Sequence, residues 1–209
     1  MDNKPPANVS AFGLLRKWKR FLSLSIVLTF VLGFLFAGVF NVALDWTNRE
    51  EFCISCHEMK VNYDEYKDSV HYSNHSGVRA VCVDCHLPKE FFPKILHKIK
   101  ASNDIWHSIL GSINTPEKYE GKRGELAERE WRRLKGNDSR ECRNCHDVNS
   151  FDLSAQGRRA AKQHEEGLLG KKQTCIECHQ GIVHTLPKGF SKTDLDNQET
   201  ETAPKAALE

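Results

Sequence analysis

Long apolar runs are scarce in this sequence of 209 residues, where only Phe21–Leu44 forms a stretch of 24 residues without a charged side chain. The mean hydropathy of -0.55 excludes a polytopic membrane protein, although it allows a single anchor. A large excess of one charge is also missing, because 30 basic residues are balanced by 28 acidic residues. The charges are mixed along the chain without a basic stripe, so no nucleic-acid partner is expected.

Cysteines outside one repeated motif are absent. All eight cysteines lie in four Cys-x-x-Cys-His runs, which are the attachment signature of c-type haem. Two thiols three positions apart reach the two vinyl groups of one porphyrin, and the following histidine is placed beneath the iron. Disulfides and structural zinc sites do not require a histidine after each pair, and a thioredoxin-like site uses a single motif. The sequence therefore predicts four covalently bound haem c groups, attached through Cys53, Cys56, Cys82, Cys85, Cys142, Cys145, Cys175 and Cys178.

The uncharged stretch Phe21–Leu44 is long enough to cross a hydrocarbon core of roughly 30 Å. A cleaved signal peptide has a shorter apolar region followed by a small-x-small site, which Ala43-Leu44-Asp45 matches poorly. Residues 1–20 carry five Lys or Arg residues against one Asp, whereas residues 45–58 carry four acidic residues against one Arg. The positive-inside rule then predicts a single-pass anchor at 21–44 in the bacterial inner membrane, with residues 1–20 cytoplasmic and 45–187 periplasmic, where c-type haem is attached.

The four motifs fall into two pairs that resemble a duplicated unit. Their first cysteines are separated by 29, 60 and 33 residues, so a longer stretch divides the pairs. His71 lies 15 residues before His86, and His164 lies 15 residues before His179. An acidic residue also precedes the second cysteine in the later motif of each pair. These equal offsets predict two dihaem units.

Helices rather than strands are expected around the motifs. Pro93–Leu110 predicts an amphipathic helix, with proline in its first turn and Gly111 at its end. Thr115-Pro116-Glu117 predicts a second helix start, Glu125–Lys135 is helical by composition, and Ser154–Leu169 is expected to be helical around His164. Residues 188–209 are polar and show no periodicity, which predicts a disordered tail. The predicted fold is mainly α, with one transmembrane helix followed by a small multihaem cytochrome c domain that contains little regular strand.

Each motif supplies at most one histidine to its own haem iron, and the candidates are His57, His86, His146 and His179. Among the other histidines, His71 and His164 are favoured as distal ligands because the repeat relates them. His184 lies in a stiff, partly apolar loop that could fold back onto a haem. The alternative for all three is a solvated surface histidine.

The remaining candidates are less specific. His75, His97 and His107 are more typical of surface residues or partners of haem propionates. Met59 follows the first motif as Cys-His-x-Met, and the chain has only one other methionine. A thioether is a soft iron ligand that raises the reduction potential, but a methionine that fills a gap in the core is equally compatible with the sequence.

Together these features resemble the NapC/NirT family of membrane-anchored tetrahaem quinol dehydrogenases, whose relatives include NrfH and CymA. The resemblance covers nearly the whole chain and is closer to the NapC branch than to the NrfH branch. The segments that carry it include Glu51–Met59, Ser69–Tyr72, Ser76–Ala80, Glu130–Arg133, Glu141–His146, Gln173–His179 and Gly181–Pro187.

The resemblance implies a set of site residues. It places Met59 on the first haem iron, so that His57 need not bind that iron, and it places distal histidines at His71, His164 and His184. In NrfH-like members a lysine and an acid beside the first haem form the quinol site. Asp104 matches the acid, and the lysine falls near His97-Lys98. NapC relatives often carry a histidine after Cys-His-x-Pro, but Lys89 stands there in this chain, so a role for that histidine does not transfer.

The resemblance implies an electron-transfer protein with quinol dehydrogenase activity. Menaquinol or ubiquinol would be the electron donor, and a periplasmic reductase, in the NapC branch nitrate reductase, would be the acceptor. Asp104 would then accept a proton, and Lys98 or His97 would bind a quinol oxygen. Three alternatives remain open: a quinol dehydrogenase for another periplasmic reductase, a terminal multihaem reductase with an open haem site, and a passive carrier fed by another complex.

Overall fold

The computed structural model describes residues 11–190, so the predicted disordered tail lies mostly outside the described residues, as does the first half of the predicted cytoplasmic segment. The chain divides into two compact units, residues 1–49 and residues 50–209. Helices and turns make up the described part of both units, and no strand occurs between residues 11 and 190. The mainly α fold predicted from the sequence is therefore confirmed.

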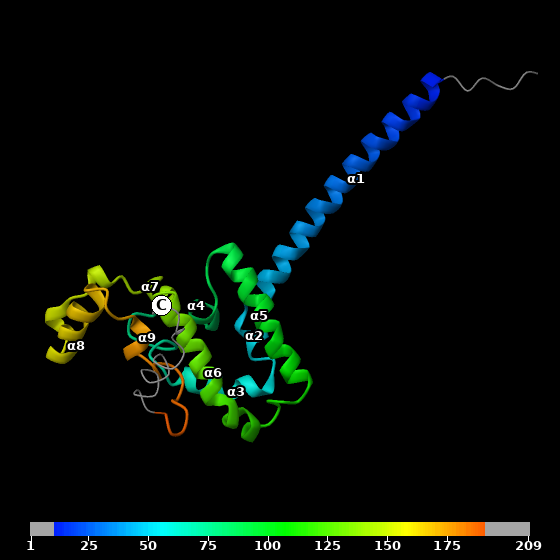
Figure 1. The fold of residues 1–209 in the computed structure, drawn as a ribbon. Coiled ribbons are helices and arrows are strands. Elements are labelled where there is room, and N and C mark those ends of the chain that lie inside the picture. Colours follow the sequence, from blue (N-terminus) through cyan, green and yellow to red (C-terminus); the bar gives the residue numbers. More distant parts are fainter. Residues whose placement is uncertain (1–10, 191–209) are drawn as a thin grey trace, which may run out of the picture. The chain divides into compact units, whose positions relative to one another are not determined.

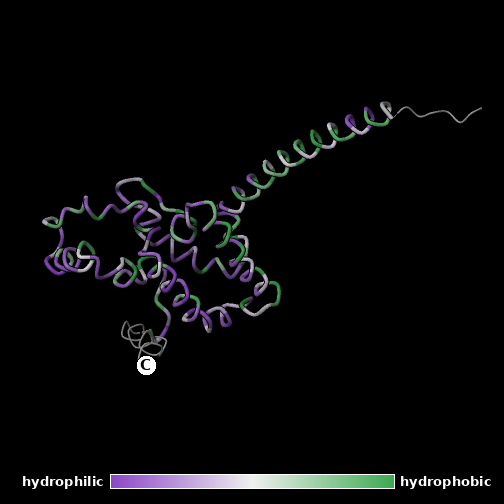
Figure 2. Tube along the Cα trace, turned by 45° about the horizontal axis from the view of Figure 1, so that its top comes forward, coloured by the Kyte–Doolittle hydropathy of each residue, from purple (hydrophilic) through white to green (hydrophobic). Residues whose placement is uncertain are grey.

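The first unit contains one long helix, α1 (Ala11–Trp46). Its 36 residues rise about 54 Å at 1.5 Å per residue, which exceeds a hydrocarbon core of roughly 30 Å. Among the described residues, only Gly13–Trp46 forms a helix long and apolar enough to cross a membrane. Figure 2 shows hydrophobic residues recurring along this helix, whereas the rest of the trace is mostly hydrophilic with short hydrophobic stretches. The helix contains the whole predicted anchor and extends beyond it at both ends.

The second unit is built from short helices that carry the motifs and two longer helices between them (Figure 1). Its elements, in chain order, are α2 (Glu50–Cys53), η1 (His57–Met59), α3 (Lys60–Lys67), α4 (Cys82–His86), α5 (Phe91–Ile109), α6 (Pro116–Gly136), α7 (Arg140–Arg143), η2 (Val148–Ser150), η3 (Leu153–Ala155), α8 (Arg158–Gln163), η4 (His164–Leu169) and α9 (Cys175–Cys178).

The two longer helices follow from local sequence signals. Helix α5 begins two residues before the predicted Pro93, which lies within its first turn, where proline is tolerated. At the start of α6, the Thr115 hydroxyl accepts a hydrogen bond from the backbone N–H of Lys118, and Pro116 is the first helical residue. The helix continues through Gly121 and Gly124, so the predicted start and the predicted segment 125–135 belong to a single helix of 21 residues.

The segment predicted as one helix, Ser154–Leu169, is instead divided into three pieces. Gly157 has an extended backbone and separates η3 from α8. From His164 the hydrogen bonds widen into the π-helical turn η4, a rare local geometry that often occurs at functional sites. The prediction of one continuous helix was therefore wrong, although it correctly placed His164 in a helical segment.

The apolar core of the second unit is small for its length. Among the described residues only six apolar side chains are buried, namely Tyr66, Leu87, Tyr119, Leu134, Leu168 and Ile176. A soluble domain of this size normally buries many more apolar side chains. The protein chain alone therefore does not supply the apolar interior that its fold requires.

Candidate functional site

Short helical turns present the cysteine pairs. The backbone N–H of His146 donates to Cys142 at 2.9 Å, and that of His179 donates to Cys175 at 3.0 Å. One such turn places residues three apart on the same side of the helix, so both thiols of a motif face one ligand. The acidic residues at equal repeat offsets stabilise these turns. The Asp84 carboxylate accepts a hydrogen bond from the backbone N–H of Val81 at 2.9 Å, and the Glu177 carboxylate accepts one from the backbone N–H of Thr174.

Thiols from different motifs contact each other within each pair. Cys53 and Cys82 share a hydrogen bond, which lowers the pKa of Cys53 to about 7 and raises that of Cys82. Cys142 and Cys175 share another, which lowers the pKa of Cys175 to about 6. None of the eight cysteines forms a disulfide. The motifs therefore adjoin as first with second and third with fourth, as the two predicted dihaem units require.

The two pairs of motifs also meet each other. Helix α4 of the second motif packs against α7 of the third. The turn before α7 is tight, with left-handed backbone at Asp138 and Ser139. The Ser139 side chain is fully buried, and its hydroxyl accepts a hydrogen bond from the backbone N–H of Ile176 at 3.1 Å. All four motif segments therefore form one continuous series, in the order in which they occur along the chain.

Six histidines form three pairs of neighbouring rings. The ring centroids are 6.2 Å apart for His71 and His146, 6.1 Å for His86 and His184, and 6.1 Å for His164 and His179. Two imidazoles bound on opposite sides of one metal, each through a bond of about 2 Å, have centroids about 6 Å apart. In each pair, one ring belongs to a motif and the other is a predicted distal histidine. These spacings, the paired thiols and the small apolar core fit four covalent haems.

Hydrogen bonds hold the distal rings in place. The His164 Nδ1–H donates to Gln156 Oε1 at 2.7 Å, which leaves Nε2 for a metal. The loop that carries His184 is fixed through its neighbour Thr185, whose N–H donates to Glu65 at 3.1 Å and whose carbonyl accepts from Arg123 at 2.8 Å.

Burial keeps two of the distal rings neutral. It lowers the pKa of His71, an effect that the neighbouring His146 strengthens. It also lowers the pKa of His184 to about 4, and the nearby His86 adds to this shift. Only a neutral imidazole has a lone pair for a metal, so both rings are in the form that binds iron near neutral pH.

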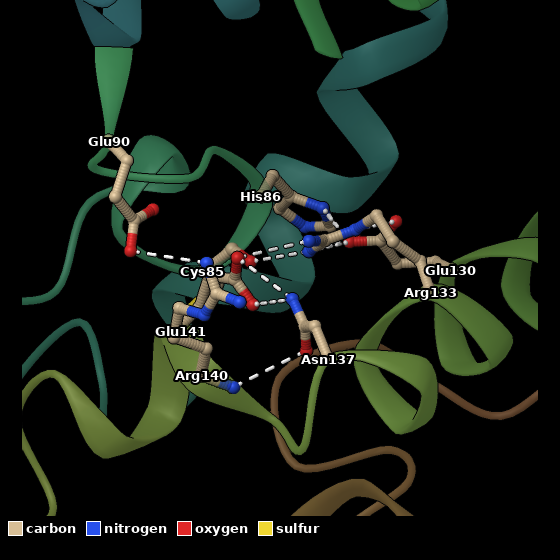
Figure 3. Close-up of polar contacts among 8 residues, drawn as sticks. All are labelled: Cys85, His86, Glu90, Glu130, Arg133, Asn137, Arg140 and Glu141. Atoms are coloured by element: carbon tan, nitrogen blue, oxygen red, sulfur yellow. Dashed lines mark hydrogen bonds and ion pairs between the residues drawn. The ribbon is translucent and has the colours of Figure 1, made fainter. Parts of the chain in front are cut away.

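A network of charged side chains, most of them partly exposed, supports the His86 ring (Figure 3). The His86 Nδ1–H donates to Glu130 Oε1 at 3.0 Å. Arg133 donates to both oxygens of Glu130, at 2.8 and 3.0 Å, and also to the Cys85 carbonyl at 3.0 Å. Glu141, whose side chain is almost fully buried, accepts from Arg133 at 3.1 Å. Burial acts to raise the pKa of Glu130, but hydrogen bonds from His86 and Arg133 outweigh it and hold that pKa well below its usual range.

Replacement of Glu130 by glutamine is expected to raise the midpoint potential of one haem by about 60 mV. The carboxylate stabilises the more positive, oxidised iron through the imidazole N–H. A charge-assisted hydrogen bond exceeds a neutral one by roughly 1.4 kcal/mol, which is about 60 mV for a one-electron couple. A spectroscopic redox titration measures the shift, with Glu128→Gln, on the same helix, as the control. Equal shifts of all four haems, or none, would contradict this expectation.

The first motif differs from the other three. The His57 Nε2–H donates to the backbone carbonyl of Asn114 at 2.7 Å, and its Nδ1 lies 3.0 Å from Glu58. Both ring nitrogens of His57 are therefore engaged by protein atoms. Met59, at the end of η1, is partly exposed, and its Sδ lies 4.0 Å from the Asn62 amide nitrogen. All three candidate ligand atoms therefore have polar protein neighbours, and the Met59 thioether, a weak acceptor at 4.0 Å, has the weakest of these contacts.

The three residues predicted for the quinol site lie on two different sides of α5. Lys98 is turned toward Cys53 of the first motif. Burial lowers the pKa of Lys98, and the nearby Cys53 acts to raise it. Asp104 pairs with Arg129 of α6 at 3.1 Å, and both side chains are about half exposed. His97 is half-buried near Glu130 and Arg133, and burial lowers its pKa. Because 3.6 residues complete a turn, Lys98 and Asp104 point in different directions, and the three side chains do not converge on one point.

Two residues that take part in this site were not recognised as such from the sequence. Glu130 belongs to a segment that carries the family resemblance, but nothing in a single glutamate shows that it reaches His86, 44 residues away. Gln156 has no local signal at all. The remaining histidines lie elsewhere: His75 is exposed, and His107 Nδ1 lies 2.8 Å from the Ser112 hydroxyl.

Comparison with known proteins gives consistent matches over most of the chain. A family model described as the N-terminal region of the NapC/NirT cytochrome c family matches residues 16–189. The denitrification system component NirT of Stutzerimonas stutzeri is 50% identical over 172 residues, which cover 82% of this chain and 85% of NirT. The cytochrome c-type protein NapC of Escherichia coli K12 is 52% identical over 163 residues, covering 78% of this chain and 81% of NapC.

A third relative is named for its haem content. A putative tetraheme cytochrome c of Allochromatium vinosum is 50% identical over 169 residues, which cover 81% of this chain and 91% of that protein. No solved structure matches the chain.

Proposed function

The chain belongs to the NapC/NirT cytochrome c family, and on that premise we propose that it oxidises membrane quinol and passes the electrons to a periplasmic reductase. Membership confirms the resemblance found in the sequence and makes the chain a membrane-anchored, tetrahaem c-type cytochrome. Haem c supplies a reversible one-electron couple when it is bound. The observation that carries the proposal is the continuous series of four motif segments, which begins beside Lys98 and ends at α9.

We propose that the protein's own residues perform three tasks. The three histidine pairs, His71 with His146, His86 with His184, and His164 with His179, would hold three of the haem irons. Met59 would hold the first iron, next to the proposed quinol site. Lys98 donates a hydrogen bond to a quinol oxygen, while Asp104 and His97 are candidates to receive the two protons that quinol loses with its two electrons.

The anchor places this chemistry at a membrane surface. Six residues separate Trp46, the last residue of α1, from Cys53. In the proposed orientation the basic N-terminal segment is cytoplasmic and residues 45–187 are periplasmic. The acceptor reductase would then contact the part of the second unit that holds the third and fourth motifs. NirT is named as a denitrification component, which favours a reductase of nitrogen oxides, and nitrate reductase is the acceptor that we propose.

Turnover experiments distinguish this proposal from a terminal reductase and from a passive carrier. Purified protein in liposomes should be reduced by menaquinol or ubiquinol analogues without any partner, and its intact mass should show four haem additions. A terminal reductase would instead oxidise dithionite with nitrite as the only other substrate. A passive carrier would be reduced by dithionite but not by quinol. Failure of both quinol analogues to reduce the haems would overturn the proposal.

Replacement of Met59 by alanine is expected to change the spectrum of one haem and leave three unchanged. Loss of a thioether ligand lowers the reduction potential of that iron or frees its axial position for water. Electron paramagnetic resonance and redox titration of the variant measure this change. Four equivalent bis-histidine signals in the unsubstituted protein would show that Met59 is not a ligand.

A further inference from the structure

Helix α5 has the reverse of the usual amphipathic arrangement. Phe92, Leu96, Ile99, Trp106 and the adjoining Leu110 recur at the helical period, so they form one stripe along the helix. These five side chains, called the α5 stripe below, are between 58% and 77% exposed. A surface helix of a soluble domain normally turns such a stripe toward the core. Here the largest apolar side chains of the helix lie on its outer surface.

The two sides of α5 that flank the stripe hold the contacts with the rest of the second unit. Lys98 lies near Cys53, and Ser108 hydrogen-bonds Glu58 next to the first motif. Asp104 reaches Arg129 of α6. The polar side chains of α5 are therefore used by the protein, and the α5 stripe faces away from the haem-binding segments.

We propose that the α5 stripe lies in the surface layer of the bilayer that holds the anchor. Contiguous exposed apolar patches on proteins mark interfaces with membranes or partners. The second unit begins at Glu50, directly after the helix that anchors the chain, so it is confined to a membrane surface. Helices that lie in this surface layer bury one apolar face among lipid headgroups and acyl chains. In α5 part of the polar surface, including Lys98 and Ser108, contacts the domain.

The composition around the α5 stripe fits a lipid surface better than a protein partner. Trp106 lies in the stripe, and tryptophan favours the membrane–water interface. Lys100 lies on α5 beside the stripe, one turn after Leu96, and cationic side chains beside an apolar face attract anionic lipid headgroups. The helix is about 28 Å long at 1.5 Å per residue, so it could rest on the bilayer over its whole length. Two contacts, the anchor and α5, would then fix how the domain is oriented on the membrane.

Lipid crosslinking of the full-length holoprotein tests this proposal. Liposomes of zwitterionic and anionic phospholipid would contain a trace of phospholipid with a photoactivatable diazirine in its acyl chain. Mass spectrometry should find lipid adducts in two segments, residues 21–44 and residues 91–110, and those in the second segment should lie on the α5 stripe. The double substitution Leu96→Glu and Ile99→Glu should reduce adducts in 91–110 at least tenfold and leave those in 21–44 unchanged. Val78→Glu, which changes an exposed apolar residue outside the stripe, should alter neither.

The outcomes separate lipid from other occupants. Adducts in 21–44 without any in 91–110 would overturn the proposal, and so would crosslinks from the stripe to a second copy or another protein. Haem content and spectra show whether the double variant is folded. If it is not, the labelling pattern of the unsubstituted protein decides alone. Lipid adducts do not depend on turnover, so this proposal and quinol oxidation can fail independently.

Discussion

Replacement of Lys98 by glutamine is expected to slow reduction of the haems by quinol at least tenfold, while reduction by dithionite remains unchanged. Lys98 is the one residue of the proposed quinol site that is turned toward the first motif. A hydrogen bond from a charged donor is worth roughly 1.5–3 kcal/mol, which corresponds to a tenfold to hundredfold change in rate. Stopped-flow spectroscopy with a quinol analogue measures the rate. Dithionite is the control that the haems remain competent.

Matched variants on the same helix make this result specific. Lys100→Gln removes the same charge two residues away and should leave the quinol rate within about twofold, because exposed charges contribute little. Asp104→Asn tests the carboxylate on the other side of α5. A tenfold slower rate keeps it as a proton acceptor, whereas an unchanged rate leaves the ion pair with Arg129 as its only role. An unchanged rate in Lys98→Gln would remove that residue from the quinol site.

Local features of the fold could be predicted because short segments encode them. The four motifs, the anchor and the cap at Thr115 each depend on a few adjacent residues, and the structure has a turn or helix at each of these positions. The duplicated offsets also have a local cause, because Asp84 and Glu177 close equivalent helical turns. The break of the segment around His164 was missed, since its π-helical turn depends on tertiary packing as well as on local propensity.

The pairing of histidines could not be predicted from the repeat. His71 and His164 stand at the same offset from their motifs, yet His164 faces His179 of its own pair, whereas His71 faces His146 of the other pair. An offset fixes where a side chain lies along the chain but not which segment it meets after folding. Glu130 was missed for the same reason, since its contact with His86 joins segments that are distant in sequence.

The position of the quinol residues shows a different limit. Asp104 and Lys98 are close in sequence, and a shared helix suggests that they act together. The structure separates them because six residues advance a helix by well over one full turn. The same geometry gathers the α5 stripe on the outer side, where a helical period in the sequence normally indicates a buried face. Periodicity identifies the apolar face of a helix, and only the structure shows what that face meets.

Removal of the His184 side chain, as His184→Gly, is expected to convert one of the four haems from low-spin to high-spin. The paired rings of His86 and His184 are 6.1 Å apart, so loss of one ring leaves a single iron without its distal nitrogen. Electron paramagnetic resonance and the optical spectrum measure the fraction converted. Added imidazole should restore the low-spin signal, because the vacated space has the shape of the lost ring. His75→Gly, at an exposed position, should change no haem.

The pairing itself is tested by combining this substitution with Glu130→Gln. Glu130 acts on the His86 ring, so the haem whose potential shifts in Glu130→Gln should be the one that becomes high-spin in His184→Gly. In the double variant the two effects should fall on that single haem, and their sum should depart from additivity. His71→Gly should convert a different haem, because its ring faces His146. If Glu130→Gln and His184→Gly altered different haems, His86 and His184 would not share an iron, and the proposed ligand assignment would be wrong.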